Sequence, residues 1–297
     1  MSCNEGPIDL HIHSNKSSDG DFSPFHIIKL AKKKKLRAIS ISDHDTLAAY
    51  PEALHLAQKA DIELIPSLEL TTSFRGREFH LLLPFVNWRN KEIKRIIKEV
   101  VKRRFEEAEE RVAKLQELNF DITWKEVLKK SEPYPPLGVT IAQILLDKAC
   151  EKKSDDRLRK YMKGNNKLFA PYLFYKDYFT ENKPAYVPKK NISLVEVLKK
   201  ISLTEGIPVL AHPGAYFQRT TREDLCFLKE EGLVGLEVFT SYHEPAQTEF
   251  YGKIAKELDL VPVAGSDFHG RIKPHIPFGS IQAGGYWMVE ELKKRRG

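Results

Sequence analysis

Histidine and carboxylate side chains that could bind metal ions occur at several separate points along the chain. The first is the segment Ile8-Asp9-Leu10-His11-Ile12-His13, in which apolar and polar residues alternate. Alternate side chains of a strand share a face, so Asp9, His11 and His13 would all point to one side. Two imidazoles placed in this way are close enough to bind one metal ion. A His-x-His pair also occurs on ordinary polar strand faces, so this segment alone favours a structural role.

More residues of this kind lie near the ends of other predicted strands. Including the first segment, short β-prone runs predict seven strands, at 8–13, 38–42, 62–66, 78–83, 207–212, 234–239 and 260–265. Their alternation with helical patterns indicates an α/β protein with a parallel sheet in a closed or nearly closed barrel. In such folds, sites assemble at the carboxyl ends of the strands. The residues there are His11, His13, Asp43, His44, Glu69, His80, His212, Glu237, Asp267 and His269. Together they offer nitrogen and oxygen ligands for two or three divalent ions.

The middle of the chain departs from this alternation. A long, charge-rich helix is predicted from about residue 87 to residue 120, and an aromatic segment covers residues 168–179. We therefore interpret residues 90–188 as a helical insertion between two parts of the barrel, 7–89 and 189–297. The aromatic side chains of the insertion could stack nucleic-acid bases. The favoured interpretation is that they form the core of a small helical subdomain.

Composition narrows the class of protein. Hydrophobic residues make up 41% of the chain and charged residues 30%, which is typical of a soluble globular protein. No apolar run is long enough to span a bilayer, and the first strand begins too early for a signal peptide, so we expect a cytoplasmic protein without membrane association. The net charge of +7 favours anionic ligands, although its lysine runs are equally typical of solvated helix faces. No protein partner is evident.

The motifs, taken together, resemble those of the PHP (polymerase and histidinol phosphatase) superfamily. The matching segments, in the family's order, are Asp9–His13, Ser42–Asp45, Glu69, His80, Leu210–Pro213 and Gly265–His269. The resemblance implies a distorted, TIM-like (β/α)7 barrel with a trinuclear metal centre. It implies one ion held by His11, His13, Glu69 and Asp267; a second by Glu69, His80 and His212; and a third by Asp19, His44 and His269.

A closer resemblance is to the stand-alone branch of 3′,5′-nucleoside bisphosphate phosphatases, also known as 5′→3′ exoribonucleases of short RNA. The features that carry it are the helical insertion, Pro184-Ala185-Tyr186-Val187-Pro188, and Gly235-Leu236-Glu237-Val238 with His243 downstream. One segment departs from the branch. Its members usually carry a basic residue and a histidine before the Ile-Ala of an insertion helix, where this chain has Leu137-Gly138-Val139-Thr140. The departure bears on the nucleotide substrate and leaves the metal centre intact.

These residues predict a metal-dependent phosphoesterase that hydrolyses phosphate monoesters or diesters of nucleotides. In this hypothesis a hydroxide held between metals bound by Glu69 attacks phosphorus, and His243 protonates the leaving oxygen. Asp9, Asp43 and Glu237 would orient imidazoles as carboxylate partners. Ligands of this kind suit Mn²⁺, Fe²⁺ or Zn²⁺. The alternatives are another phosphatase of the superfamily, such as a histidinol-phosphate phosphatase, and a nucleic-acid-binding module with a structural metal site.

Overall fold

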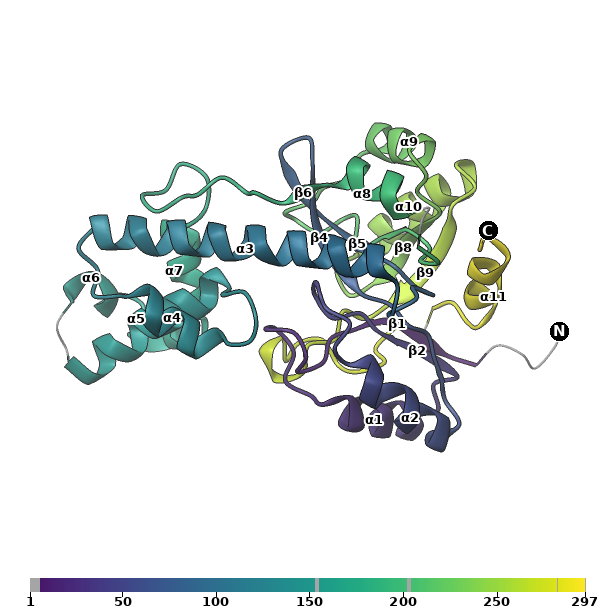
Figure 1. The fold of residues 1–297 in the computed structure, drawn as a ribbon, viewed down its shortest axis with the longest axis horizontal. Helices are drawn as coiled ribbons and strands as arrows, with labels where there is room; N and C mark the ends of the chain where they lie inside the picture. The colour runs from purple at the N-terminus through teal and green to yellow at the C-terminus, as the bar shows by residue number, and fades with distance from the viewer. Residues whose placement is uncertain (1–5, 153–154, 202–203, 282, 297) are drawn as a thin grey trace. The chain divides into compact units, whose positions relative to one another are not determined.

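The computed structural model of the protein describes residues 6–152, 155–201, 204–281 and 283–296 (Figure 1). The chain divides into two compact units. One contains residues 1–100 together with 191–297, and the other contains residues 101–190. The first unit has an α/β fold and carries all the candidate site residues, whereas the second is helical.

A three-stranded parallel sheet forms the beginning of the first unit. Its strands, in spatial order, are β1 (Ile8–Ile12), β2 (Ala38–Ile41) and β3 (Glu63–Leu64). Helices α1 (Pro24–Lys33) and α2 (Tyr50–Ala60) connect them. Ser23 and Pro24 predict the start of α1, and the helix begins there because the Ser23 side chain accepts a hydrogen bond from the His26 N–H and Pro24 occupies the first helical turn. Every residue of β1 and β2 is buried, as expected of strands covered on both faces.

The remaining strands form a mixed sheet in the order β6-β4-β5-β7-β8-β9. Their bounds are β4 Glu69–Phe74, β5 Arg77–Leu82, β6 Ile192–Ser193, β7 Val209–Leu210, β8 Gly235–Thr240 and β9 Val261–Gly265. The prediction of a wholly parallel sheet was wrong here, since β5 runs antiparallel to both β4 and β7. The two-residue turn Arg75-Gly76, with φ angles of 49° and 75°, joins β4 to β5 as a hairpin.

Backbone contacts connect the two sheets at two places. Near the ends of β1 and β9, the His13 N–H donates to the Phe268 carbonyl at 2.9 Å and the Asp267 N–H donates to the His11 carbonyl at 2.8 Å. Just after β2, the Asp45 N–H donates to the carbonyl of Glu69, the first residue of β4, at 2.9 Å. The carboxyl ends of β1, β2 and β9 are thereby held beside the start of β4.

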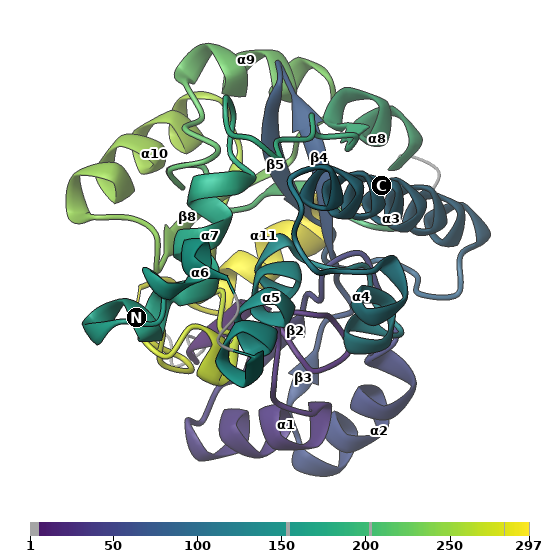
Figure 2. The same cartoon turned by 90° about the vertical axis from the view of Figure 1, so that its left-hand side faces the viewer.

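Helices cover the outside of the strands in this unit, and Figure 2 shows α1, α2, α9 and α10 around them. The helices of the second half are α8 (Leu194–Ile201), α9 (Arg222–Glu230), α10 (Pro245–Glu257) and α11 (Trp287–Lys294), with the 3₁₀ turn η2 at Gly270–Ile272. The sequence predicts a helix over residues 193–204, with Ser193 as a possible N-cap; residues 202 and 203 lie outside the described residues. Leu194, Val197, Leu198 and Ile201 of α8 are buried in the core against residues of β4, β5 and β8.

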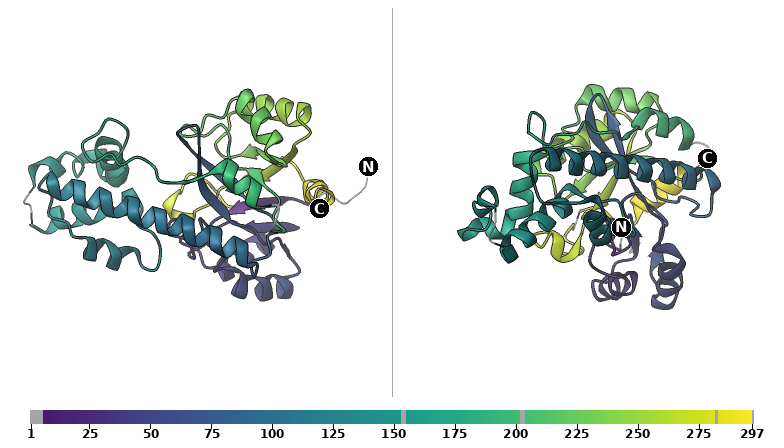
Figure 3. Two further views of the ribbon diagram at one scale, coloured as in Figure 1. Left: turned by 45° about the horizontal axis from the view of Figure 1, so that its top comes forward. Right: turned by 60° about the vertical axis from the view of Figure 1, so that its left-hand side comes forward.

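The second unit is built from helices, with the C-terminal part of α3 (Lys91–Glu117) packed beside α4, α5 and α7 (Figure 3). Its other elements are α4 (Trp124–Ser131), α5 (Gly138–Lys152), α6 (Asp156–Arg159), η1 (Gly164–Phe169) and α7 (Ala170–Tyr178). Phe174 and Phe179 of the aromatic segment are buried in the core of this unit, while Tyr172 is 48% exposed. Core packing therefore accounts for Phe174 and Phe179. Across the described residues of both units, we find no helix with the length and apolar composition needed to cross a membrane.

Replacement of Phe174 by Ala should destabilise the helical unit by about 3–5 kcal/mol, because it removes a fully buried aromatic ring. Tyr172→Ala, on the same helix, should change stability by less than about 0.5 kcal/mol because that side chain is largely exposed. Urea unfolding followed by circular dichroism measures both. Equal unfolding midpoints for the two variants would contradict the assignment of Phe174 to the core.

Candidate metal centre

The nine side chains predicted as metal ligands lie close together in the first unit. Most of them occupy strand ends or the loops that follow, and Asp19 lies in the loop between β1 and α1. Each has at least one ring nitrogen or carboxylate oxygen within 4 Å of another member. We refer to them as the metal-ligand cluster: His11, His13, Asp19, His44, Glu69, His80, His212, Asp267 and His269.

The most deeply buried part of the cluster contains His11, His13, Glu69 and Asp267. The Nε2 atoms of His11 and His13 lie 3.2 and 3.1 Å from Glu69 Oε2, and 3.2 and 3.0 Å from Asp267 Oδ1. The two Nε2 atoms are 3.1 Å apart. Ligand atoms bonded to one divalent ion at about 2.1 Å lie about 3.0–3.4 Å from each other. These four residues therefore have the spacing of a metal site, and their atoms form one of three groups that could hold an ion.

Glu69 also connects this group to a second one. Its Oε1 atom lies 2.9 Å from His80 Nδ1 and 3.0 Å from His212 Nε2. Its Oε2 atom lies 3.2 Å from His44 Nε2, and His44, Glu69 and His80 form another possible ligand group. A carboxylate that contacts imidazoles with both oxygens can bridge two ions.

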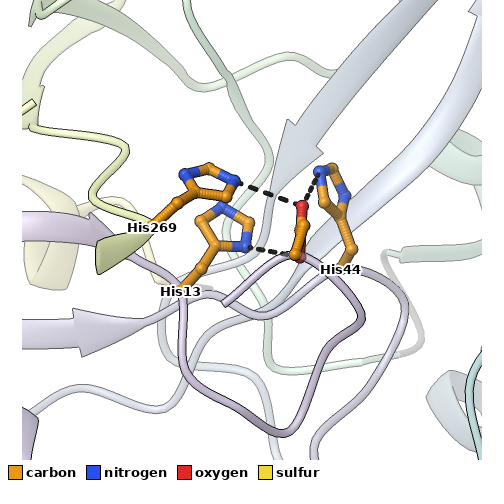
Figure 4. Close-up of side chains that lie close together, drawn as sticks. His13, His44 and His269 are labelled. Carbon is orange, nitrogen blue, oxygen red and sulfur yellow. Dashed lines mark hydrogen bonds and ion pairs between the residues drawn. The ribbon is translucent and has the colours of Figure 1, made fainter. Parts of the chain in front are cut away.

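A third group surrounds Asp19. Figure 4 shows His13, His44 and His269 extending toward one another from three separate segments. Asp19 Oδ2 lies 3.2 Å from His269 Nε2 and 3.4 Å from His44 Nε2, while Asp19 Oδ1 lies 3.7 Å from His13 Nδ1. His13 therefore contacts both this group and the one that contains Asp267.

Two residues of the cluster have unusual backbone conformations. Asp267 has a φ angle of 57° and His212 one of 23°, which cost a residue with a side chain about 1–3 kcal/mol each. Hydrogen bonds hold both in place, since the Asp267 N–H donates to the His11 carbonyl and the His212 N–H donates to Glu237 Oε2 at 2.7 Å. These bonds aim both side chains into the cluster.

Of the three carboxylates expected to orient imidazoles, Glu237 contacts a ring nitrogen directly. Glu237 Oε1 lies 2.9 Å from His11 Nδ1, which leaves His11 Nε2 facing Glu69 and Asp267. Gly265 on β9 makes room for this pair, because a Cβ there would collide with Glu237 and His11. Asp9 accepts hydrogen bonds from the backbone and hydroxyl of Ser266, and Asp43 accepts from those of Ser14. Their role of orienting imidazoles stays a prediction.

The histidines and carboxylates of the cluster shift one another's pKa values. Burial alone would lower the pKa of His13, but Asp19, Asp267 and Glu69 outweigh it and raise the pKa to about 10. Glu69 in the same way raises the pKa of His80 to about 9, whereas burial lowers that of His44 to about 4. Burial opposes ionisation of Glu69, yet His44, His11 and His80 hold its pKa well below the usual value. The buried carboxylates thus remain charged and require nearby cations.

Several buried atoms of the cluster lack a hydrogen-bond partner among the described residues. They are the Nδ1 atoms of His13, His44 and His212, and Oε2 of Glu69. Buried polar atoms are normally hydrogen-bonded, and exceptions need an explanation. Glu69 Oε2 lies within 3.2 Å of three imidazole nitrogens without hydrogen-bonding geometry, as expected if its lone pairs and theirs point to a common ion. The donor set therefore fits divalent metal ions.

His243, the predicted proton donor, has both ring nitrogens bonded to backbone. Its Nε2 accepts a hydrogen bond from the Gly214 N–H at 3.0 Å, so Nδ1 must carry the proton and donate it to the Val238 carbonyl at 2.9 Å. Burial lowers the pKa of the ring, which favours this neutral form. Through these two bonds His243 holds the segment after His212 in place. The catalytic role of His243 stays a prediction.

Sequence reasoning missed Lys273 and Tyr242 at the edge of the cluster. Lys273 Nζ lies 2.8 Å from Asp267 Oδ2 and donates to the Tyr242 hydroxyl at 2.9 Å. The Tyr242 ring is 4.9 Å from that of His212. Asp267 thus gives one oxygen to Lys273 and keeps the other toward His11 and His13. The position of Lys273 in the loop after β9, four residues beyond His269, was the available signal.

Comparison with known proteins gives a consistent assignment. A family model described as the PHP domain matches residues 9–178, more than half of the chain. A 5′-3′ exoribonuclease from Haemophilus influenzae is 26% identical over 282 residues, covering 93% of this chain and 92% of its own length. A 3′,5′-nucleoside bisphosphate phosphatase from Chromobacterium violaceum is 25% identical, with 88% and 87% covered. A crystal structure from Bifidobacterium adolescentis, described as a candidate metal-dependent phosphoesterase, is similar with a TM-score of 0.80, 26% identity, and 99% and 98% covered.

Metal binding to the cluster should release protons near pH 7. Imidazole binds metal in its neutral form, and the raised pKa values of His13 and His80 mean that both rings carry protons which an ion must displace. The affinity for Mn²⁺ should therefore rise from about pH 6 to about pH 8. Calorimetric titration in two buffers of different ionisation enthalpy measures the released protons. An affinity that does not change with pH, with no proton exchange, would show that the ions bind elsewhere.

Proposed function

The chain belongs to the PHP domain family, and we propose that it is a metal-dependent phosphoesterase acting on phosphorylated nucleotides. The observation that carries the proposal is the metal-ligand cluster, in which buried imidazoles and carboxylates have the separations of shared metal ligands. The substrate class follows two relatives that cover 93% and 88% of this chain, one named for RNA and one for a nucleoside bisphosphate. A nucleoside 3′,5′-bisphosphate or the 5′ end of a short RNA is the proposed substrate.

The proposal includes an architecture for the whole chain. The hydrogen bonds between β1 and β9 and between the β2 end and β4 support a distorted (β/α)7 barrel, closed by the two sheets together. The helical residues 90–188 would be an insertion into that barrel. The closed arrangement would account for the depth at which the metal-ligand cluster is buried.

We propose that two or three divalent ions, Mn²⁺, Fe²⁺ or Zn²⁺, bind in the metal-ligand cluster. One would be held by His11, His13, Glu69 and Asp267; a second by Glu69, His80 and His212; a third by Asp19, His44 and His269. When bound, such ions lower the pKa of a coordinated water and neutralise charge on a phosphate. Three carboxylates and six imidazoles leave a cluster of three divalent ions with net positive charge, which suits an anionic ester.

Residues of the chain would position the ligands and the substrate. Glu237 fixes the tautomer and orientation of His11, and Lys273 holds Asp267 so that a single oxygen faces the cluster. Lys273 also adds a cation where a phosphate would lie. His243 remains the candidate for protonating the leaving oxygen, and to do so it would first have to release the Gly214 N–H.

A phosphate-release assay of the intact protein with Mn²⁺ tests the proposal. Its substrates are a nucleoside 3′,5′-bisphosphate, a short 5′-phosphorylated RNA, histidinol phosphate and a sugar phosphate. We expect release from one or both of the first two substrates, and loss of that release on chelation of the metal. Preferential hydrolysis of histidinol phosphate would favour the alternative phosphatase, and tight RNA binding without hydrolysis would favour a nucleic-acid-binding module.

His11→Ala and Asp267→Ala should each lower phosphatase activity by more than about 100-fold, since even residues that only orient metal ligands contribute about 10- to 100-fold. Metal analysis should show fewer bound ions, while circular dichroism should show an unchanged fold. His55→Ala is the matched control, because His55 is an exposed histidine on α2, outside the cluster. Undiminished activity in the His11 variant at equal metal content would refute the proposed ligand set.

A further inference from the structure

Two neighbouring aromatic side chains, Tyr216 and Phe217, lie on the turn that follows His212, and Phe217 contacts the metal-ligand cluster. The ring of Phe217 is 5.3 Å from that of His80 and 5.5 Å from that of His212. Tyr216 meets Phe217 edge to face at 5.4 Å. We call Tyr216 and Phe217 the aromatic platform. Phe217 therefore borders the cluster, and Tyr216 continues the aromatic surface from Phe217.

The turn that carries the platform is firmly anchored. The buried Gln218 accepts a hydrogen bond from the His80 N–H and donates to the Ala211 carbonyl at 3.0 Å. Arg77 donates to the Gln218 carbonyl at 2.8 Å, and the Tyr251 hydroxyl donates to that of Pro213 at 3.1 Å. The position of the platform relative to the metal-ligand cluster is therefore set before any ligand arrives, which lowers the entropic cost of binding.

Tyr216 is nevertheless 64% exposed, the highest value among the large hydrophobic side chains that the structure describes. The anchored turn thus presents an aromatic ring that is largely exposed to solvent. Conformationally fixed aromatic rings on loops are typical of binding surfaces. The groups around the aromatic platform indicate which ligand it suits. Tyr242 contacts the same His212 ring as Phe217, and its hydroxyl accepts a hydrogen bond from Lys273.

We propose that the aromatic platform stacks the base of a nucleotide whose phosphate lies at the metal-ligand cluster. A cation, a metal-ligand cluster and an aromatic surface side by side match a ligand with an anionic end and a flat aromatic end. This inference rests on the proposed function and names the part of the substrate that the metals cannot select. Stacking accepts any base, because every base has a π face, so the preference would be for a nucleotide over a base-free phosphate rather than for one base.

Tyr216→Ala in the full chain, loaded with Mn²⁺, tests the platform by calorimetric binding of adenosine monophosphate and of ribose 5-phosphate. We expect adenosine monophosphate to bind about 5- to 100-fold more weakly than to the wild type, and ribose 5-phosphate to bind within about twofold of it. Tyr216→Phe should keep wild-type affinity for both. Phe250→Ala on α10 is the control, since Phe250 is also an exposed aromatic residue, at 47%, and contacts no residue of the cluster or the platform among its described ring partners.

The outcomes separate the platform from the phosphatase activity. If Tyr216→Ala weakens both ligands equally, or neither, stacking is refuted while nucleotide hydrolysis by the wild type can still stand. Equal wild-type affinity for the two ligands would overturn the platform in the same way. If the wild type releases phosphate from no ester and binds neither ligand, the proposed function fails and the platform fails with it.

Discussion

The burial of the Glu69 carboxylate is the constraint on which the rest of this structure depends. The side chain is fully buried, and an ionised carboxylate in that position costs several kcal/mol unless cations or hydrogen bonds compensate it. Five imidazoles, those of His11, His13, His44, His80 and His212, come within 3.2 Å of its two oxygens. Glu69 is also where β4 meets the segment after β2, so one residue both joins the two sheets and organises the cluster.

Most of this arrangement can be predicted from the sequence, because alternation along a strand gives the face of each side chain and the strand ends indicate where the site assembles. His11 and His13 share a face by the period of two, and Asp267 and His269 follow the last strand. The β4–β5 hairpin was not predicted, because Glu69 was interpreted as a residue that follows the predicted strand 62–66 and the Arg75-Gly76 turn was overlooked. For Asp9 and Asp43 the sequence indicates the position in or just after a strand but not the hydrogen-bond partners, which are Ser266 and Ser14. Lys273 follows His269 by four residues, but its contact with Asp267 depends on the path of an irregular loop, which the sequence does not reveal.

The metal-ligand cluster suits phosphate esters in general, so the choice of substrate depends on the side chains around it. The helical unit offers few recognisable determinants of substrate choice. Phe174 and Phe179 serve its core, and Leu137–Thr140 lacks the basic residue and the histidine that are typical of the branch that this chain resembles. In the first unit, by contrast, Lys273 and the aromatic platform border the cluster directly. In this account phosphate recognition depends on charge, and nucleotide recognition depends on a rigid aromatic surface.

Anomalous diffraction at the manganese absorption edge, from crystals of the protein grown with Mn²⁺, locates bound ions directly. We expect anomalous density within the metal-ligand cluster, with one ion contacted by His11, His13, Glu69 and Asp267, and another beside His80 and His212. Density confined to the molecular surface, with the cluster residues hydrogen-bonded only to one another at millimolar Mn²⁺, would contradict a metal centre at these residues.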